Sequence, residues 1–227
     1  MEVMEYKREC REGILKIACV CFAMLWMITS DGQQDLRTKA ISTYDRFLAS
    51  PFPAMDFETI DSSIFNTSAL AHKTVYVDFW FTACPPCLKQ IPYAKQLHAY
   101  FAADTNVVFL NICIENNDRK QAWTRMVKEK AIGGINVFYA RNRPQKINLL
   151  RQFNIVDYPT YLLLNNLKVM GYDAPAPSEK GWVHWAIYEA AKNIPLSTSY
   201  ALLVNKTKQA NDYLTQNWPL IEGSEIP

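Results

Sequence analysis

Two near-continuous apolar runs of β-forming residues, VYVDFWF at 75–81 and VVFLNICI at 107–114, are the strongest pattern in the chain. Such runs are typical of strands buried on both faces, as in a parallel sheet. From Cys84 onward the apolar residues recur every three or four positions, which indicates a helix between the two strands. The stripe consists of Cys87, Ile91, Ala94, Leu97 and Phe101.

Shorter patterns predict the remaining elements. Residues 56–66 read as two short strands around a turn at Asp61-Ser62-Ser63, and residues 135–140 as another strand. Residues 160–172 predict a hairpin with a two-residue turn at Asn165-Asn166, because asparagine tolerates left-handed dihedrals. Further helices are expected at 33–48 and at 119–131, the second capped by Asn117 or Asp118 and ended by Gly133-Gly134. A third begins at Pro144, with Ile147, Leu150 and Phe153 facing inward, and a fourth is marked by Trp182, Trp185, Ala186 and Ala190. The last is expected at roughly 198–215, with Tyr200, Leu203, Val204 and Leu214 facing inward.

This order of elements predicts the fold class. It runs βαβ, then one more helix and strand, then a helix, a β-hairpin and a helix, which indicates a three-layer α/β domain. The 227 residues suit one domain with extensions, and 49% apolar residues are sufficient for a buried core. The formal charge is only +2 and no Lys/Arg block stands out, so composition argues against a nucleic-acid partner.

The N-terminus carries a separate signal. The apolar run IACVCFAMLWMI, residues 17–28, follows four basic residues. It is short for a membrane span and typical of a signal-peptide core, with cleavage after Ser30. An uncleaved anchor is the competing interpretation, and a soluble core helix fits less well because the run has no polar face. We therefore expect a domain in the periplasm or cell envelope, attached to the inner membrane only if residues 1–30 remain.

Six cysteines are present, and three of them (Cys10, Cys19 and Cys21) fall in this targeting segment. The exported domain then keeps the pair Cys84 and Cys87 and the single Cys113, which is too few for a disulfide-framework fold. In an exported domain a dithiol is oxidised, or is kept reduced by dedicated partners. Cys113 lies within an apolar strand, and we expect it to be an inert core residue.

The stretch ACPPC, residues 83–87, places a cysteine pair at a predicted helix N-terminus. Unpaired N–H groups and the helix dipole favour the thiolate form there, so Cys84 is the candidate nucleophile. Cys87 lies one turn later on the inward stripe and is expected to be the less exposed, resolving thiol. Pro85 suits the first helical turn, where its missing N–H costs nothing, and Pro86 stiffens the loop and removes a second donor.

Two other interpretations of the pair remain open. A structural zinc site needs four ligands, and only Cys113, His72, His98 and His184 are available outside the pair. A purely structural disulfide would close a very small loop, so that chain entropy would stabilise the fold little.

Two residues outside the pair are unusual for their surroundings. Asp78 lies in the middle of a buried strand, where a carboxyl group is costly without a partner. It either faces a polar pocket or caps a nearby group, or it relays a proton to and from Cys87, for which burial would raise its pKa. Pro159 stands just before a predicted strand, although proline cannot donate to a ladder, and a cis bond is one explanation.

These residues together resemble the thioredoxin superfamily. The stretch from Asp78 to Pro92 (VDFW…CPPC…P) matches the active-site strand and helix, and Tyr158-Pro159-Thr160 matches the cis-proline segment. The resemblance covers about residues 55–192 and is greatest to exported TlpA/ResA-type thiol–disulfide oxidoreductases. It implies an α/β/α sandwich with an N-terminal β-hairpin and a central αβ insertion. The expected parts are 1–30 (signal peptide or anchor), 31–54 (helical linker), 55–194 (thioredoxin-like domain) and 195–227 (C-terminal extension, partly helical).

The resemblance also implies the site and the activity. It implies a nucleophile at Cys84, a resolving cysteine at Cys87, a buried acid at Asp78 and a kink-forming proline at Pro92. A surface made of Pro159, Tyr158, Trp80, Pro85 and Pro86 would bind protein substrates that carry disulfides or thiols. The redox-active Cys84–Cys87 disulfide would replace any cofactor, no metal would be needed, and an envelope protein would supply electrons.

The chain departs from its relatives at two positions. Gln90 stands where the TlpA-type pattern often has a glutamate, so Asp78 would have to serve as the acid, and Ala83 replaces the usual aromatic residue before the first cysteine. Two other functions are retained as alternatives. One is a peroxiredoxin-like peroxidase, suggested by Thr82 two residues before Cys84, and the other is a non-catalytic binding or scaffold module.

Overall fold

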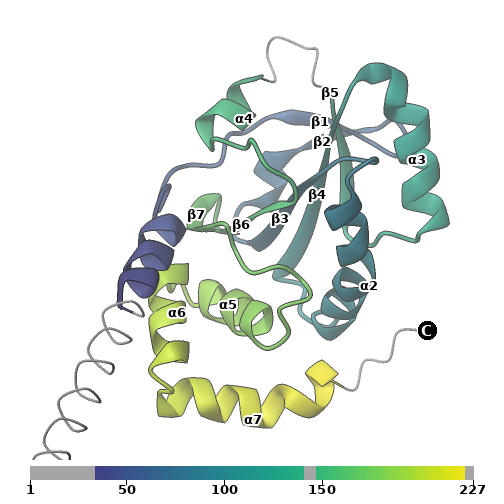
Figure 1. Cartoon of the computed structure of the whole chain (residues 1–227). Helices are drawn as coiled ribbons and strands as arrows, with labels where there is room; N and C mark the ends of the chain where they lie inside the picture. The colour runs from purple at the N-terminus through teal and green to yellow at the C-terminus, as the bar shows by residue number, and fades with distance from the viewer. Residues whose placement is uncertain (1–33, 141–146, 223–227) are drawn as a thin grey trace, which may run out of the picture. The chain divides into compact units, whose positions relative to one another are not determined.

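The computed structural model describes residues 34–140 and 147–222 of the chain (Figure 1). The chain divides into two compact units, Met1–Ser42 and Thr43–Pro227. Residues 34–42 of the first unit are helical, and the helix continues through residue 44. In the described part of the chain, no helix is long and apolar enough to cross a membrane. The predicted targeting segment, residues 1–30, lies outside the described residues.

The second unit is built on one sheet with the strand order β2-β1-β5-β4-β3-β6-β7. Strand β3 is an inner strand and pairs in parallel with β4 and antiparallel with β6. Helix α2 connects β3 to β4, as the alternation of apolar runs predicts. The strands are β1 (Asp56–Thr59), β2 (Ile64–Asn66), β3 (Thr74–Trp80), β4 (Val107–Glu115), β5 (Ile135–Ala140), β6 (Thr160–Asn165) and β7 (Lys168–Tyr172). The helices are α2 (Pro85–Tyr100), α3 (Lys120–Glu129), α4 (Ile147–Gln152), α5 (Trp182–Ala191), α6 (Leu196–Val204) and α7 (Lys208–Glu222), with short 3-10 turns η1 (Thr67–Leu70) and η2 (Asn117–Arg119).

Both faces of the sheet are covered, which gives the three layers that the sequence predicts. Alternate residues of β3 point to opposite faces. Val75, Val77 and Phe79 join one hydrophobic cluster with Leu149 of α4 and Phe153 just after it. Residues of the other face pack against α2, α3 and α5 in two clusters, one around Tyr76 and one around Trp80. Asp78 lies between these two clusters on the α2 side of the sheet.

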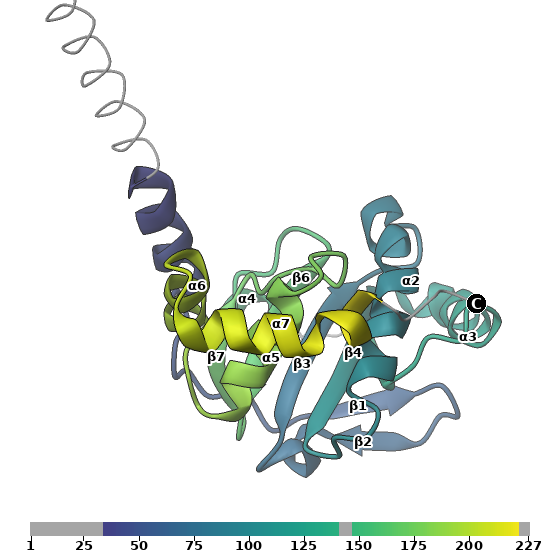
Figure 2. The ribbon, with the colours of Figure 1, turned by 90° about the horizontal axis from the view of Figure 1, so that it is seen from below.

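The C-terminal helices α6 and α7 pack against the domain (Figures 1 and 2). Trp185 of α5 donates its indole N–H to the carbonyl oxygen of Ser199 in α6, at 3.0 Å. The hydroxyl of Tyr100, the last residue of α2, donates to Asn217 of α7 at 2.9 Å. The extension therefore holds the far end of the helix that begins beside the cysteines.

Residues 49–52 run along the outer edge of β7. The amide N–H of Ala49 donates to Val169 at 2.8 Å, and the N–H of Val169 donates to Ser50 at 3.0 Å. The N–H of Phe52 donates to Leu167 at 2.8 Å. This segment thus supplies hydrogen bonds that the last strand would otherwise lack on that side.

Three local predictions were wrong or shifted. The hairpin turn is Asn166-Leu167, both with positive φ, and Asn165 pairs with Lys168 inside the ladder. Neither Asn117 nor Asp118 caps α3, which ends at Glu129 rather than at Gly133. The expected last helix is two helices, separated at 205–207, where Lys206 has a φ of 49°. The predicted helix start at Pro144 lies outside the described residues, while Leu150 and Phe153 face the core as predicted, together with Leu149.

Candidate active site

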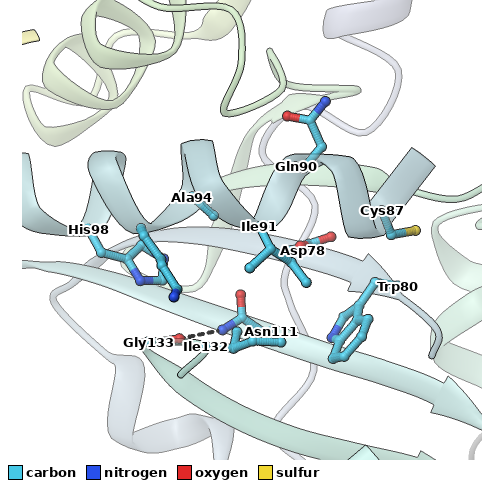
Figure 3. A pocket seen from close by; sticks show the side chains of 11 residues that line it. Asp78, Trp80, Cys87, Gln90, Ile91, Ala94, His98, Asn111, Ile132 and Gly133 are labelled. Atoms are coloured by element: carbon cyan, nitrogen blue, oxygen red, sulfur yellow. Dashed lines mark hydrogen bonds between the residues drawn. The ribbon is translucent and has the colours of Figure 1, made fainter. Parts of the chain in front are cut away.

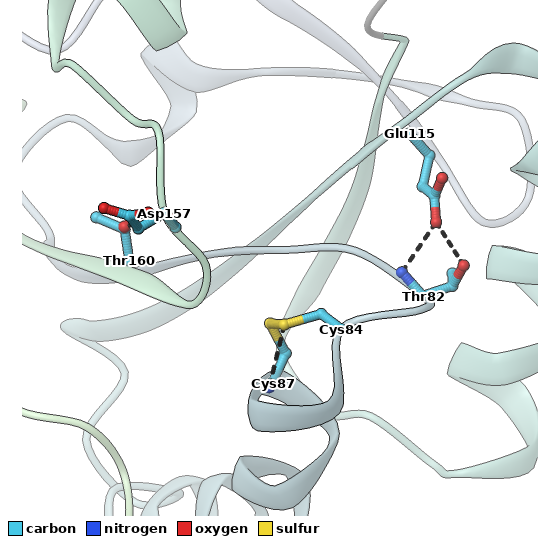
Figure 4. The surroundings of a disulfide bond; sticks show 6 residues. All are labelled: Thr82, Cys84, Cys87, Glu115, Asp157 and Thr160. Carbon is cyan, nitrogen blue, oxygen red and sulfur yellow. Dashed lines mark hydrogen bonds between the residues drawn. A yellow bond between two sulfur atoms is a disulfide. The ribbon is translucent and has the colours of Figure 1, made fainter.

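Cys84 and Cys87 form a disulfide at the start of α2, with Cα atoms 5.3 Å apart (Figure 4). Cys84 is the N-cap residue, and its Sγ accepts a hydrogen bond from the N–H of Cys87 at 3.2 Å. Pro85 and Pro86 have no N–H, so the N–H of Cys87 is the first donor of the helix. In the reduced state the same N–H and the helix dipole would stabilise a Cys84 thiolate and lower its pKa.

The exposure of the two cysteines differs from the prediction. Cys84 was expected to be the more accessible one, yet it is 1% exposed and Cys87 is 4% exposed. Phe81 and Tyr158 pack against the cluster that contains both sulfurs, and their rings meet edge to face at 5.4 Å. In the oxidised protein, neighbouring side chains must therefore move before a partner can reach Cys84.

Cys113 also belongs to this cluster, as a free and fully buried thiol. Burial raises the pKa of the Cys113 thiol well above its ordinary value. A thiol that stays protonated is a poor nucleophile, in agreement with the prediction of a core residue.

Asp78 lies beneath α2, directly opposite Asn111 of β4 and Tyr161 of β6. Its Oδ1 is buried and has no hydrogen-bond partner. Burial raises the pKa of Asp78 from 3.8 to about 7, as expected for a carboxyl group in an apolar strand. An acid with this pKa gains and loses a proton near neutral pH, which suits proton exchange with a thiol.

A cavity of about 20 Å³ connects Asp78 with Cys87 (Figure 3). A volume of about 10–15 Å³ is enough for one water molecule, so the cavity has room for solvent. Its walls come from α2, from β3 and β4, and from the loop before β5. The lining residues are Asp78, Trp80, Cys87, Gln90, Ile91, Ala94, Lys95, His98, Asn111, Ile132 and Gly133.

The end of the cavity away from the disulfide is tightly packed. The Asn111 side-chain amide donates to the carbonyl oxygen of Gly133 at 2.8 Å. A Cβ atom on Gly133 would lie 2.6 Å from Nδ1 of His98, so only glycine fits beside that ring. Burial lowers the pKa of His98 to about 4, and the imidazole is neutral at pH 7.

Gln90, the first of the two departures, joins α2 to the loop after β7. Its side-chain amide donates to Oγ of Ser178 at 3.1 Å and accepts from the N–H of Ser178 at 3.0 Å. Gln90 therefore links α2 to this loop by two hydrogen bonds at the cavity wall, and it does not serve as an acid. Ala83, the second departure, is exposed beside the disulfide.

Sequence reasoning missed the role of Glu115. This carboxylate, at the end of β4, accepts hydrogen bonds from both the N–H and the hydroxyl of Thr82, the N–H at 3.0 Å (Figure 4). Arg119 donates to the same hydroxyl at 3.2 Å. The sequence pattern could have indicated this contact. Thr82 comes just after β3 and Glu115 is the last residue of β4, and the carboxyl ends of these neighbouring parallel strands share one edge of the sheet.

The predicted substrate-binding residues fall into two groups. Pro85 and Pro86 are exposed, Tyr158 and Pro159 are partly exposed, and the Tyr158–Pro159 bond is cis. Trp80 is 3% exposed and lines the cavity under α2, so the structure removes it from the surface that a partner could touch.

The described residues contain no cluster of three or more His, Cys, Asp or Glu side chains that could hold a metal ion.

A family model described as Redoxin matches residues 48–169, more than half of the chain. Sporulation thiol-disulfide oxidoreductase A of Bacillus subtilis (strain 168) is 25% identical over 108 residues, which is 48% of this chain and 62% of that protein. The chain thus spans less than two thirds of the length of this relative.

Two solved structures share the fold. The thioredoxin domain of a thiol-disulfide oxidoreductase from Bacteroides vulgatus matches with a TM-score of 0.52 at 19% identity, covering 64% of this chain and 96% of that one. A thiol:disulfide interchange protein of the thioredoxin family from Chlorobium tepidum TLS matches with a TM-score of 0.50 at 23% identity, covering 63% and 96%. These matches establish the thioredoxin-like fold of the region that contains the cysteine pair.

Proposed function

The chain belongs to the Redoxin family, and from this premise we propose that it is a thiol–disulfide oxidoreductase that reduces disulfides of cell-envelope proteins. The observation that carries the proposal is the Cys84–Cys87 disulfide at a helix N-terminus, with the unpartnered Asp78 carboxyl in the cavity behind it. The curated relative, named as a thiol-disulfide oxidoreductase, supports the same class of reaction.

The reaction begins from the reduced pair. The Cys84 thiolate attacks one sulfur of the partner's disulfide, which gives a mixed disulfide and releases the other partner sulfur as a thiolate. The Asp78 carboxylate takes the proton of Cys87, whose thiolate then attacks Sγ of Cys84. The second partner sulfur leaves and is protonated, so the partner gains two electrons and the Cys84–Cys87 disulfide forms. A reduced thiol protein of the envelope must return two electrons for the next cycle.

The exposed residues around the pair are proposed to receive the partner. Pro85 and Pro86 lie between the two cysteines, and Tyr158, which precedes Pro159, packs against the cluster that contains both sulfurs. Ala83, the small exposed residue before Cys84, leaves room on the surface for a partner chain, although Cys84 itself is buried. Export through residues 1–30 would bring the domain to disulfide-bearing proteins of the envelope.

Trapping tests this function. In full-length Cys87→Ala protein, the mixed disulfide at Cys84 cannot be resolved, and envelope proteins should accumulate on it as reducible adducts. Cys84→Ser/Cys87→Ala protein should trap none, and Cys113→Ala protein should exchange disulfides like the wild type. Adducts that persist without Cys84 would refute the assignment of the nucleophile.

A measured reduction potential tests the direction of the reaction. Thioredoxin-fold proteins range from roughly −270 mV for reductants to −120 mV for oxidants. We expect a value toward the reducing end, and a value near −120 mV would refute the reductase function.

A further inference from the structure

The cavity under α2 contains two buried polar atoms that no hydrogen bond satisfies, Oδ1 of Asp78 and Nδ1 of His98. Buried polar atoms of this kind are costly unless water or a proton-transfer partner satisfies them. The mechanism above uses Asp78 but leaves His98 without a role.

The two residues occupy different positions along the cavity. His98 follows Cys87 by eleven residues on α2, roughly 16 Å at 1.5 Å per residue, and Figure 3 shows Asp78 between them. Nδ1 of His98 is buried, while the residue as a whole is half-buried on α2. His98 is therefore in contact with the cavity and is also partly open to solvent.

Other titratable groups near Asp78 are less suited to exchanging its proton. The phenols of Tyr76 and Tyr161 have pKa values raised well above 10 by burial, and the thiol of Cys113 is likewise held protonated. Lys95 also lines the cavity, but an ammonium group has no acceptor for a proton. The groups that face Asp78 are Cys87, Lys95 and His98 from α2, Tyr76 from β3, Cys113 from β4 and Tyr161 from β6.

The proposed reaction needs a route by which a proton can leave the cavity at the end away from the disulfide. Cys87 is only 4% exposed, and in the mixed disulfide a partner bound at Cys84 would cover it further. The proton that Asp78 has taken from Cys87 must then leave from the other end of the cavity. A neutral imidazole can accept a proton at one ring nitrogen and release one from the other.

We propose that His98 is the proton-relay residue of this site, through which the Asp78 carboxyl exchanges its proton with solvent by way of water in the cavity. This deepens the proposed function and rests on Asp78 as the base for Cys87. In each turnover a proton passes from Asp78 through water to Nδ1 of His98, while Nε2 releases one to solvent. The imidazole returns to its starting tautomer by exchange with water. The relay itself transfers only protons and changes no oxidation state.

Hydrogen–deuterium exchange of the Asp78 carboxyl tests the relay without any substrate. The oxidised full-length protein is transferred into D₂O below pH 7, where Asp78 is protonated, and its carbonyl infrared band is followed. Loss of the band in Asp78→Asn protein assigns it. His98→Phe fills the same space without a transferable proton, and it should slow the exchange by about a hundredfold or more, the low end of what a positioned acid–base group contributes.

His184 provides a matched control. Burial also lowers its pKa to about 4 and leaves its Nδ1 unpartnered, but it lies on α5 and does not line the cavity. In His184→Phe protein, the Asp78 carboxyl should exchange its hydrogen for deuterium at the wild-type rate. An unchanged rate in His98→Phe, or equal slowing in both variants, would overturn the proposal. If His98→Phe fails to fold, His98→Gln takes its place with the same expected slowing.

Chemical rescue gives an independent readout that a structural role would not produce. Resolution of the mixed disulfide should be slower in His98→Ala protein and should recover when free imidazole is added. Failure of imidazole to restore the rate would refute the relay. Wild-type protein that exchanges no disulfides would refute the proposed function, whereas the infrared experiment would still decide the role of His98.

Discussion

Thr82 donates both its backbone N–H and its hydroxyl to a single carboxylate oxygen of Glu115, across the ends of β3 and β4. This contact fixes the loop that leads into Cys84. Glu115→Ala should lower the free energy of unfolding by about 1–3 kcal/mol, because buried donors lose a charged acceptor. Attack of reduced protein on a small-molecule disulfide should also slow, as measured by stopped flow.

Glu115→Gln retains one acceptor oxygen and should lose less stability than the alanine variant. Glu129→Ala, an exposed change on α3, is the matched control in urea denaturation. If Glu115→Ala protein had the same free energy of unfolding as Glu129→Ala protein and attacked the small-molecule disulfide at the same rate, the positioning role of Glu115 would be wrong.

Asp78 should make the stability of the oxidised protein depend on pH. Its folded-state pKa of about 7 lies above the ordinary 3.8, so the stability it contributes is complete below pH 3.8 and is lost as the pH rises through 7. Asp78→Asn should match the wild type near pH 4 and exceed it above pH 7, by on the order of 4 kcal/mol. Urea unfolding across this range measures the difference.

Asp61 provides a control with the opposite sign. Hydrogen bonds from Thr59 and Ser63 lower the pKa of this exposed carboxyl to about 2. Its contribution is present above pH 3.8 and is lost as the pH falls toward 2, so Asp61→Asn should not be more stable than the wild type at pH 7. A difference between Asp78→Asn and wild type that does not vary with pH would contradict the buried-acid interpretation.

Gln90→Glu should raise the pKa of Asp78 above about 7, because it adds a second carboxylate to the same cavity wall. The new oxygen can still accept from the N–H of Ser178. The titration midpoint of the Asp78 infrared band measures the shift. Gln121→Glu adds the same charge at an exposed position of α3. In this control variant the titration midpoint of the Asp78 band should equal that of the wild type.

Gly171 of β7 tests how the C-terminal extension is attached. A Cβ atom at this position would lie 2.3 Å from Cβ of Leu196, the first residue of α6. Gly171→Ala should therefore cost about 1–3 kcal/mol through overpacking. Amide hydrogen exchange should accelerate in α6 and remain slow in α2, and uniform acceleration in both helices would contradict local displacement of α6.

The sheet and the cysteine site could be predicted because burial on both faces demands continuous apolar runs. Residues 75–81 and 107–114 are strands for that reason, and the helical stripe through Cys87 placed α2 correctly. The hairpin turn was shifted by one residue because Asn165 and Asn166 are chemically identical. A tertiary contact decides between them, since Asn166 is bonded to the backbone of His72 and Lys73.

Other features depend on residues far apart in the sequence. The break between α6 and α7 has no Gly or Pro to mark it, and the two helices bend around Trp185 of α5. Cys84 is buried within a cluster that residues of other elements, Tyr158 among them, complete, and local helix geometry does not predict that packing. The identification of Glu115 required knowing which strand ends lie side by side.

The segment 49–52 along β7 has a consequence for how the protein behaves at high concentration. It occupies the exposed edge of the last strand, and at the other side of the sheet β2 is only three residues long. Long unpaired edges are templates for strand addition and aggregation. Under the proposed function, partner chains that carry unpaired strands would meet the cysteine pair without meeting a long unpaired edge of the sheet.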